Sequence, residues 1–170
     1  MENDIEKLKF PIGKYKAILE FNFSRTIQDI KTLESFANNL KDSVKGLDKT
    51  DFKKTYRYGG MNIAQIIHHY CDTHTYAFLR TKHTLLEDNP SVKMYEVSEF
   101  LTTPESNVLD VEDSLKVIEG IHAKWVSLLK TLSENDFNKT YYHSDRDKNI
   151  ILHEHVGMYA WHTKHHLVHI

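Results

Sequence analysis

Apolar residues recur at helical spacing along four long segments of the chain. In the first segment, steps of three and four residues connect apolar positions as one face of an amphipathic helix requires. These positions are Ile27, Ile30, Phe36 or Ala37, Leu40, Val44 and Leu47. The pattern ends at Gly46-Leu47-Asp48, where a turn is expected.

The second and third segments are bounded by clear turn signals. Asn62 follows the turn "YRYGGM" and is a good N-cap for a helix that should run to about Glu87. A third helix is predicted from about Val111 to Leu132, and a fourth from about Ile150 to the last residue. The loop over 87–107 is long enough to be suspected of covering a site, and it can include a helical turn at 96–101.

These patterns predict an all-α fold. No segment shows sustained two-residue alternation bounded by turns, so a sheet has little support. Four helices of some 20 residues, packed side by side, make a four-helix bundle the natural architecture, with a long loop between the second and third helices. The length of 170 residues favours a single domain over 1–170.

Composition narrows the possible partners and chemistry. Lys and Arg total 22 against 24 Asp and Glu, and no long basic run is present, so neither a nucleic acid nor a membrane is expected as a partner. One cysteine excludes an internal disulfide and an all-cysteine metal cage. The N-terminus lacks the apolar core of a signal peptide and no stretch is long enough to span a bilayer, so a cytoplasmic location is expected.

The compositional excess is histidine, with 12 residues concentrated in the second and fourth predicted helices. On a helical wheel of the fourth helix, Leu152, Val156, Tyr159, Thr163 and Ile170 define a buried stripe. A second stripe along its edge contains His155, His162, His166 and His169. His153 and His165 fall elsewhere and are predicted to face solvent.

Within the second stripe, His162 and His166 are spaced i, i+4, so both imidazoles can reach one metal ion. His165 and His169 have the same spacing but point away from the predicted core. A third ligand would come from His68, His69 or His74 on the second helix. Periodicity favours His74, but a central histidine is often a core residue, and spacing does not decide. The whole set could also be edge histidines that bond to neighbouring helices.

Several segments resemble one known family over nearly the whole chain. They are "FPIGKY" at 10–15, "YRYGGMNIAQIIHHYCDTH" at 56–74, "IHAKWVSLLKTL" at 121–132, "YYHSD" at 141–145 and "GMYAWHTKHHLVHI" at 157–170. The chain thereby resembles the DinB/YfiT-like superfamily of metal-binding four-helix bundles, and within it the YfiT-type metal-dependent hydrolases. The resemblance implies that His69, His162 and His166 bind one divalent metal ion.

Two kinds of reaction follow from that resemblance. A tris-histidine ion can activate water, as in a hydrolase, or bind a thiol, as in a transferase of bacillithiol or a similar low-molecular-weight thiol. Zinc or nickel is the expected metal, and no organic cofactor is expected. The alternative is a non-catalytic bundle in which the ion only joins the second and fourth helices. Such a bundle could form a homodimer.

Candidates for acid–base chemistry are Asp72, three residues after His69, and His143 in the loop before the fourth helix. Asp72 could equally orient an imidazole or be a solvated helix charge. Tyr95 and Glu96 in the long loop are candidates for the border of the pocket.

Overall fold

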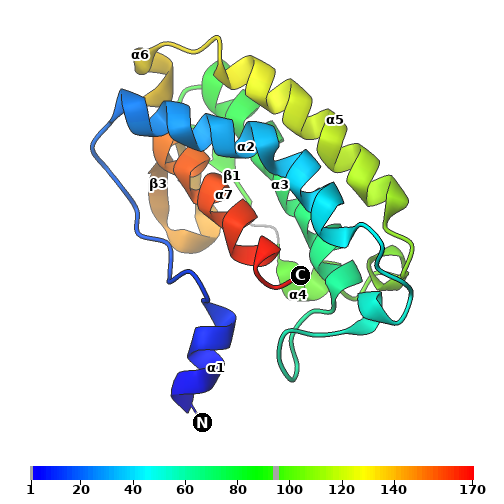
Figure 1. Cartoon of the computed structure of the whole chain (residues 1–170). Coiled ribbons are helices and arrows are strands. Elements are labelled where there is room, and N and C mark those ends of the chain that lie inside the picture. The colour runs from blue at the N-terminus through cyan, green and yellow to red at the C-terminus, as the bar shows by residue number, and fades with distance from the viewer. Residues whose placement is uncertain (1, 94–95) are drawn as a thin grey trace.

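Four long helices form the body of the protein. The computed structural model describes residues 2–93 and 96–170. The long helices are α2 (Phe23–Val44), α3 (Ile63–Leu86), α5 (Glu112–Leu129) and α7 (Leu152–Leu167). Both α2 and α3 pack against α5 on one side and α7 on the other, which closes the bundle (Figure 1). The predicted four-helix bundle is confirmed.

Local capping explains where two of these helices begin. The Asn62 side chain accepts a hydrogen bond from the backbone N–H of Gln65, and the Gln65 side chain accepts one from the backbone N–H of Asn62. This capping box satisfies first-turn donors of α3 and confirms the predicted N-cap. Asn22 caps α2 in the same way by accepting from the N–H of Arg25. After α2 the chain turns at Gly46, whose φ of +84° is in the left-handed region that favours glycine.

Shorter elements surround the bundle. They are the helices α1 (Glu2–Lys9), α4 (Val97–Phe100) and α6 (Glu134–Phe137) and the 3₁₀ turns η1 (Asp51–Lys53), η2 (Glu105–Asn107) and η3 (Ser144–Arg146). Helix α4 lies at the predicted helical turn in the long loop. Tyr95 lies outside the described residues. No helix in the described ranges combines the length and the apolar character that crossing a bilayer requires.

A small sheet was not expected from the sequence. Strands β1 (Ser91–Val92), β2 (Thr140–His143) and β3 (Lys148–Ile151) are ordered β1-β2-β3, with a parallel first pair and an antiparallel second pair. The prediction of little support for a sheet is therefore wrong at this corner. Its strands have two to four residues, too few for alternation to be recognised. The sheet joins the long loop to the segment before α7.

The core consists of two apolar clusters separated by a layer of imidazoles. One cluster contains Phe36 and Tyr70, and the other contains Trp125 and Tyr159. The fully buried ring of His74 contacts all four of these aromatic side chains. His122, 2% exposed, stacks on His74 and also contacts both clusters. Neutral polar rings therefore occupy the middle of the bundle.

Helix α7 differs from the prediction in where it ends and in which of its residues are buried. It ends at Leu167 rather than at the last residue. His153 and His165 are buried, which corrects the prediction that they face solvent. The reason is the N-terminal segment, which runs beside α7 before α2 begins (Figure 1). Within it, the Ile18 carbonyl is 3.2 Å from Nε2 of His153, and the ring of Phe10 contacts that of His165.

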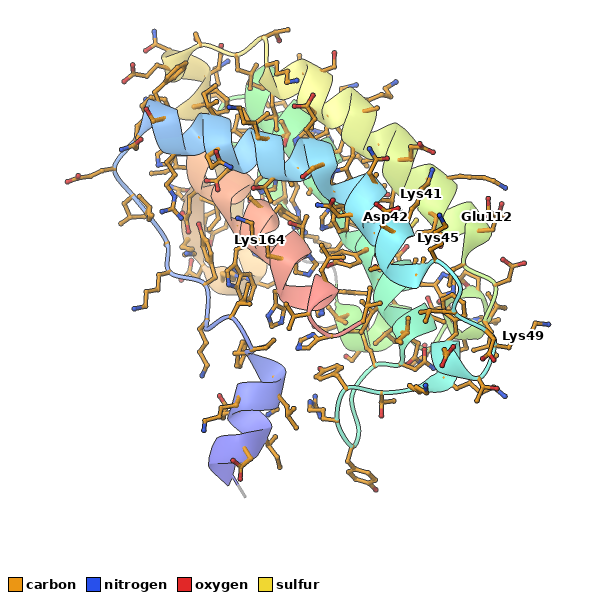
Figure 2. The ribbon with its side chains drawn as sticks, viewed as in Figure 1. Lys41, Asp42, Lys45, Lys49, Glu112 and Lys164 are labelled. Carbon is orange, nitrogen blue, oxygen red and sulfur yellow. The ribbon has the colours of Figure 1, made fainter. Side chains whose placement is uncertain are left out.

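The outer faces of α2 and α5 carry charges of both signs. Lys41, Asp42, Lys45 and Glu112 lie there (Figure 2). Lys41 forms an ion pair of 2.7 Å with Glu119 across the two helices. This mixed surface agrees with the small net charge and provides no basic patch for an anionic polymer.

Candidate metal centre

Three histidines from two helices converge near the C-terminal end of α7. His69 comes from α3, and His162 and His166 come from successive turns of α7. One ring nitrogen of each lies within 4.8 Å of those of the other two. The ring centroids are 4.7–5.2 Å apart. Three imidazoles at this spacing can bind one tetrahedral ion and leave a fourth position for water or substrate.

Helix geometry separates His69 from its two rival histidines on α3. Both nitrogens of His68 are engaged elsewhere, Nδ1 with the Ser114 hydroxyl at 2.8 Å and Nε2 with the Val108 carbonyl at 3.1 Å. His74, the choice that periodicity favours, is 3.0 Å from Nδ1 of His162 and so lies behind that ring. The three histidines of the resemblance are thus brought together, and their role as ligands stays a prediction.

A chain of hydrogen bonds fixes the tautomer of His162. Burial lowers the pKa of His122 to about 4 and those of His74 and His162 well below their usual value, so all three rings are neutral at neutral pH. The Leu33 carbonyl can only accept, so Nδ1 of His122, 2.8 Å away, donates to it. Nε2 of His122 then accepts from Nδ1 of His74 at 2.7 Å, and Nε2 of His74 accepts from Nδ1 of His162. His162 is left with a deprotonated Nε2.

The other two ligands are oriented by the same logic. Nε2 of His169 donates to the Leu8 carbonyl at 2.9 Å, so its Nδ1 accepts from Nδ1 of His166 at 3.2 Å. The Thr73 hydroxyl donates to the His69 carbonyl at 2.5 Å, so it accepts from Nδ1 of His69 at 3.2 Å. All three histidines therefore keep their proton on Nδ1 and present a bare Nε2.

Deprotonated nitrogens that face one another favour a cation between them. Nε2 of His69 and Nε2 of His162 are only 3.2 Å apart, and neither has a proton to share in these tautomers. Burial also lowers the pKa of His69 to about 4 and that of His166 well below its usual value, which opposes a shared proton. Neutral imidazole is the form that binds a metal. The residues fit a divalent ion.

A second group, His165, His166 and His169, also has nitrogens close enough to hold an ion. In this group, however, both nitrogens of His169 are already engaged, one with Leu8 and one with His166. No bare nitrogen is left on that ring. The group that contains His69 is therefore the better metal site.

The hydrogen-bond chain behind His162 leads to a testable prediction. His122→Leu should weaken zinc binding by roughly 10–100-fold, because His74 then loses the acceptor that holds its tautomer. His122→Gln should retain near-normal affinity, since an amide can donate to Leu33 and accept from His74. Competition with a chromogenic chelator measures both affinities. Equal affinities of the two variants would contradict this account of the chain.

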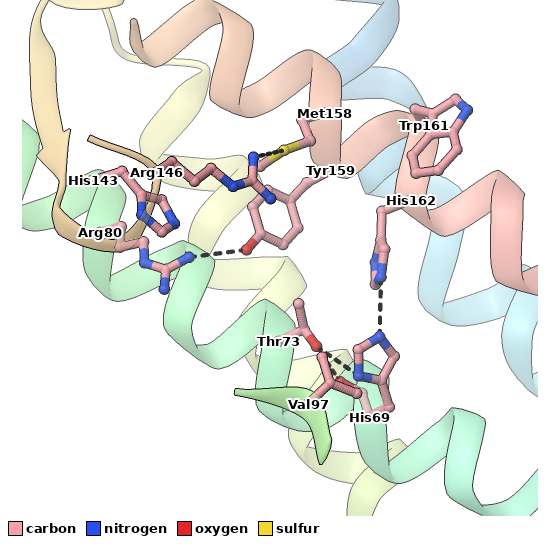
Figure 3. Close-up of a pocket in the computed structure, with 10 residues that line it drawn as sticks. All are labelled: His69, Thr73, Arg80, Val97, His143, Arg146, Met158, Tyr159, Trp161 and His162. Atoms are coloured by element: carbon pink, nitrogen blue, oxygen red, sulfur yellow. Dashed lines mark hydrogen bonds between the residues drawn. The ribbon is translucent and has the colours of Figure 1, made fainter. Parts of the chain in front are cut away.

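A cavity of about 250 Å³ lies beside His69 and His162. It is also lined by Thr73, Arg80, Val97, His143, Arg146, Met158, Tyr159 and Trp161 (Figure 3). His143, expected in a loop, is the last residue of strand β2 and lines this cavity, while its acid–base role stays a prediction. Burial, followed by the charges of Arg146 and Arg80, lowers the pKa of His143, so its ring is neutral at neutral pH.

The other acid–base candidate is placed differently. Asp72 is half-buried on α3 but does not line the cavity, and its charge raises the pKa of Cys71, after the larger effect of burial. The neighbouring Thr73, a full turn after His69, takes the place beside that ring. The sequence reasoning missed Arg80, Arg146 and Tyr159 in the pocket. Only the i, i+4 relation of Thr73 to His69 could have been found from spacing.

Comparisons with known proteins agree with this geometry. The family model of the DinB superfamily matches residues 32–170. The chain belongs to the DinB superfamily. A protein of Geobacillus kaustophilus named "putative metal-dependent hydrolase" is 34% identical over 162 residues, which cover 95% of this chain and 91% of that protein. The correspondingly named YfiT of Bacillus subtilis is 31% identical, with 96% and 92% covered.

The solved structure of that DinB relative has the same fold. That structure is described as "YfiT from Bacillus subtilis is a probable metal-dependent hydrolase with an unusual four-helix bundle topology". The TM-score is 0.93 at 31% identity, with 96% of this chain and 94% of the other covered. The fold and the family predicted from the sequence are thus confirmed.

Proposed function

We propose that this protein is a divalent-metal-dependent hydrolase whose ion is bound by His69, His162 and His166. The observation that carries the proposal is the convergence of three imidazoles whose Nδ1 atoms all donate hydrogen bonds, which leaves their Nε2 atoms deprotonated and able to bind an ion. The names of the relatives support it. Three imidazoles suit zinc or nickel, and one of these is the proposed metal.

The pocket beside the ion site supplies the remaining groups. When bound, the ion would supply Lewis acidity, which activates a coordinated water or polarises a substrate oxygen. His143 is neutral, and its buried Nδ1 has no hydrogen-bond partner among the described residues. It is therefore available to take a proton from the attacking group or to return one to the leaving group. Val97, Met158 and Trp161 provide an apolar wall for a small substrate.

A bound ion could also activate a thiol, so transfer of a low-molecular-weight thiol to an electrophile is the second reaction to test. A bundle in which the ion only joins α3 to α7, alone or as a homodimer, is the non-catalytic alternative.

The deciding experiment uses protein purified without an affinity tag. We expect about one zinc or nickel ion per chain by elemental analysis, as a single tris-histidine site requires. Hydrolysis of activated esters and amides should stop with a chelator and return with added metal. A thiol-transfer assay with cysteine or bacillithiol is run in parallel, and size-exclusion chromatography gives the oligomeric state.

His143→Gln separates an enzyme from a metal-stapled bundle. Its metal content should equal that of the wild type, whereas turnover should fall about 100-fold, because general acid–base groups contribute at least this much. His83→Gln, an exposed histidine on α3, is the matched control. Full metal occupancy without turnover in either assay would favour the structural role.

A further inference from the structure

A buried arginine lies in the wall of the metal pocket. Arg80 on α3 is 7% exposed. One guanidinium nitrogen donates to the Lys93 carbonyl at 2.7 Å and another to the Tyr159 hydroxyl at 3.4 Å. Both partners are neutral, and Nε has no hydrogen-bond partner among the described residues. The guanidinium also lies over the Tyr76 ring, 5.6 Å from its centroid, but no carboxylate of the described residues forms a hydrogen bond with it. Its buried positive charge therefore favours an anionic ligand in the pocket.

Two further polar groups lie around the same end of the pocket. Arg146 comes from η3, and its Nη1 is 3.9 Å from the sulfur of Met158. His143 is 4% exposed, and its Nδ1 also has no partner within the described ranges. The two arginines and His143 are gathered on one side of the pocket, and His69 and His162 lie on the other (Figure 3).

We propose that Arg80 and Arg146 form a subsite for a carboxylate group of the substrate. Guanidinium groups bind carboxylates with strong, charge-assisted hydrogen bonds. The apolar side chains of Val97, Met158 and Tyr159 would contact the body of the same molecule. The substrate is then a small carboxylic acid whose reactive bond lies toward the histidine cluster. This last step rests on the proposed function, whereas binding of the carboxylate does not.

The opposing explanation is purely structural. Arg80 could serve only to hold the loop after β1 through the Lys93 carbonyl, with water filling the rest of the pocket. A structural arginine would stabilise the fold but would not make the pocket prefer an anion over a neutral molecule of the same shape.

Benzoate and benzamide provide a pair of probes that match in shape and differ in charge. Calorimetric titration of the zinc-loaded protein should show benzoate binding about tenfold more tightly than benzamide, as a charge-assisted contact predicts. Arg146→Gln, at an exposed position that should tolerate the change, is expected to remove most of this preference. Arg80→Gln should do the same, and Arg25→Gln on α2 is the matched control that should keep it.

Repeating the titration without zinc identifies where the carboxylate binds. If benzoate still binds more tightly than benzamide in the zinc-free protein, the arginines bind its carboxylate. If this difference disappears without zinc, the metal ion binds the carboxylate and the proposal is overturned. Absence of benzoate binding, or a preference unchanged in Arg146→Gln, also overturns it, even if Arg80→Gln does not fold. Because binding is measured rather than turnover, failure of the proposed hydrolysis would leave the result of this experiment intact.

Discussion

Replacing His162 by alanine is expected to abolish tight binding of zinc, whereas replacing His165, three residues further along α7, leaves it unchanged. His162→Ala removes one of three nitrogens that converge within 4.8 Å and leaves only two ligands. The affinity should fall by more than about 100-fold, because loss of groups behind a ligand already costs 10–100-fold. Competition with a chromogenic chelator measures the affinity, and circular dichroism verifies the fold.

The control distinguishes the two histidine groups at this end of α7. His165 belongs to the group with His166 and His169 but not to the group with His69. His165 is buried, with its ring stacked on Trp161 at a centroid distance of 4.5 Å, and His162 is half-buried, so both substitutions remove a packed imidazole from α7. Zinc binding that survives in His162→Ala and is lost in His165→Ala would assign the ion to the other group and refute the site proposed above.

Acid is expected to unfold the metal-free protein between about pH 6.5 and pH 4. Burial lowers the pKa of His122 to about 4 and that of His155 to about 3, whereas the same rings in the unfolded chain titrate near 6.5. In this window the unfolded chain binds more protons, so stability is full above pH 6.5 and falls as the pH falls. His122 alone withdraws about 3 kcal/mol when its titration is complete, a large share of the roughly 5–15 kcal/mol that stabilises a domain.

Fluorescence-monitored acid titration measures this transition. Zinc should move the midpoint to lower pH, because the ion binds the neutral imidazoles and competes with protons. His122→Gln removes one titrating ring and should also lower the midpoint. His83→Gln, whose imidazole is exposed, should not change it. If unfolding took up no net protons, or if the midpoint of His122→Gln equalled those of the wild type and His83→Gln, the buried histidines would not govern acid stability.

Periodicity was sufficient to predict the bundle because each long helix buries one continuous stripe. Four of the five stripe residues, Leu152, Val156, Tyr159 and Thr163, are buried as the wheel predicts, whereas Ile170 lies beyond the end of α7 and is only half-buried. The wheel was wrong for His153 because it assumes one buried face per helix. The N-terminal segment, which has no periodicity of its own, covers a second face of α7.

The pair His162 and His166 could be found from spacing, but their partner on α3 could not. His68, His69 and His74 differ in which neighbouring helix they face, and this depends on how far α3 is rotated against α7. The structure shows that His74 occupies the core position behind His162, while His69 faces the cluster directly. Periodicity favoured His74 in the centre of the core, and the resemblance selected His69, which is also buried and whose role as a ligand stays a prediction.

Arg80 and Arg146 could not be associated with the site from sequence alone. Arg80 lies three turns along α3 from His69, and Arg146 lies in η3 between two strands that the pattern did not reveal. Their meeting depends on the turn of the β2–β3 hairpin, which includes Asp147 in a left-handed conformation with φ of +46°. A turn of this kind is determined by backbone geometry rather than by hydrophobic pattern.

All three hydrogen-bond chains behind the candidate ligands end on main-chain carbonyls, at Leu33, at Leu8 and at His69 itself. A carbonyl oxygen is present whatever the side chain, so the orientation of the histidines depends on the path of the main chain at these positions rather than on their side chains. Leu8 even precedes the region that the family model matches. A shift of the main chain in the N-terminal segment would therefore reorient His169, and through it His166, without a change in any histidine.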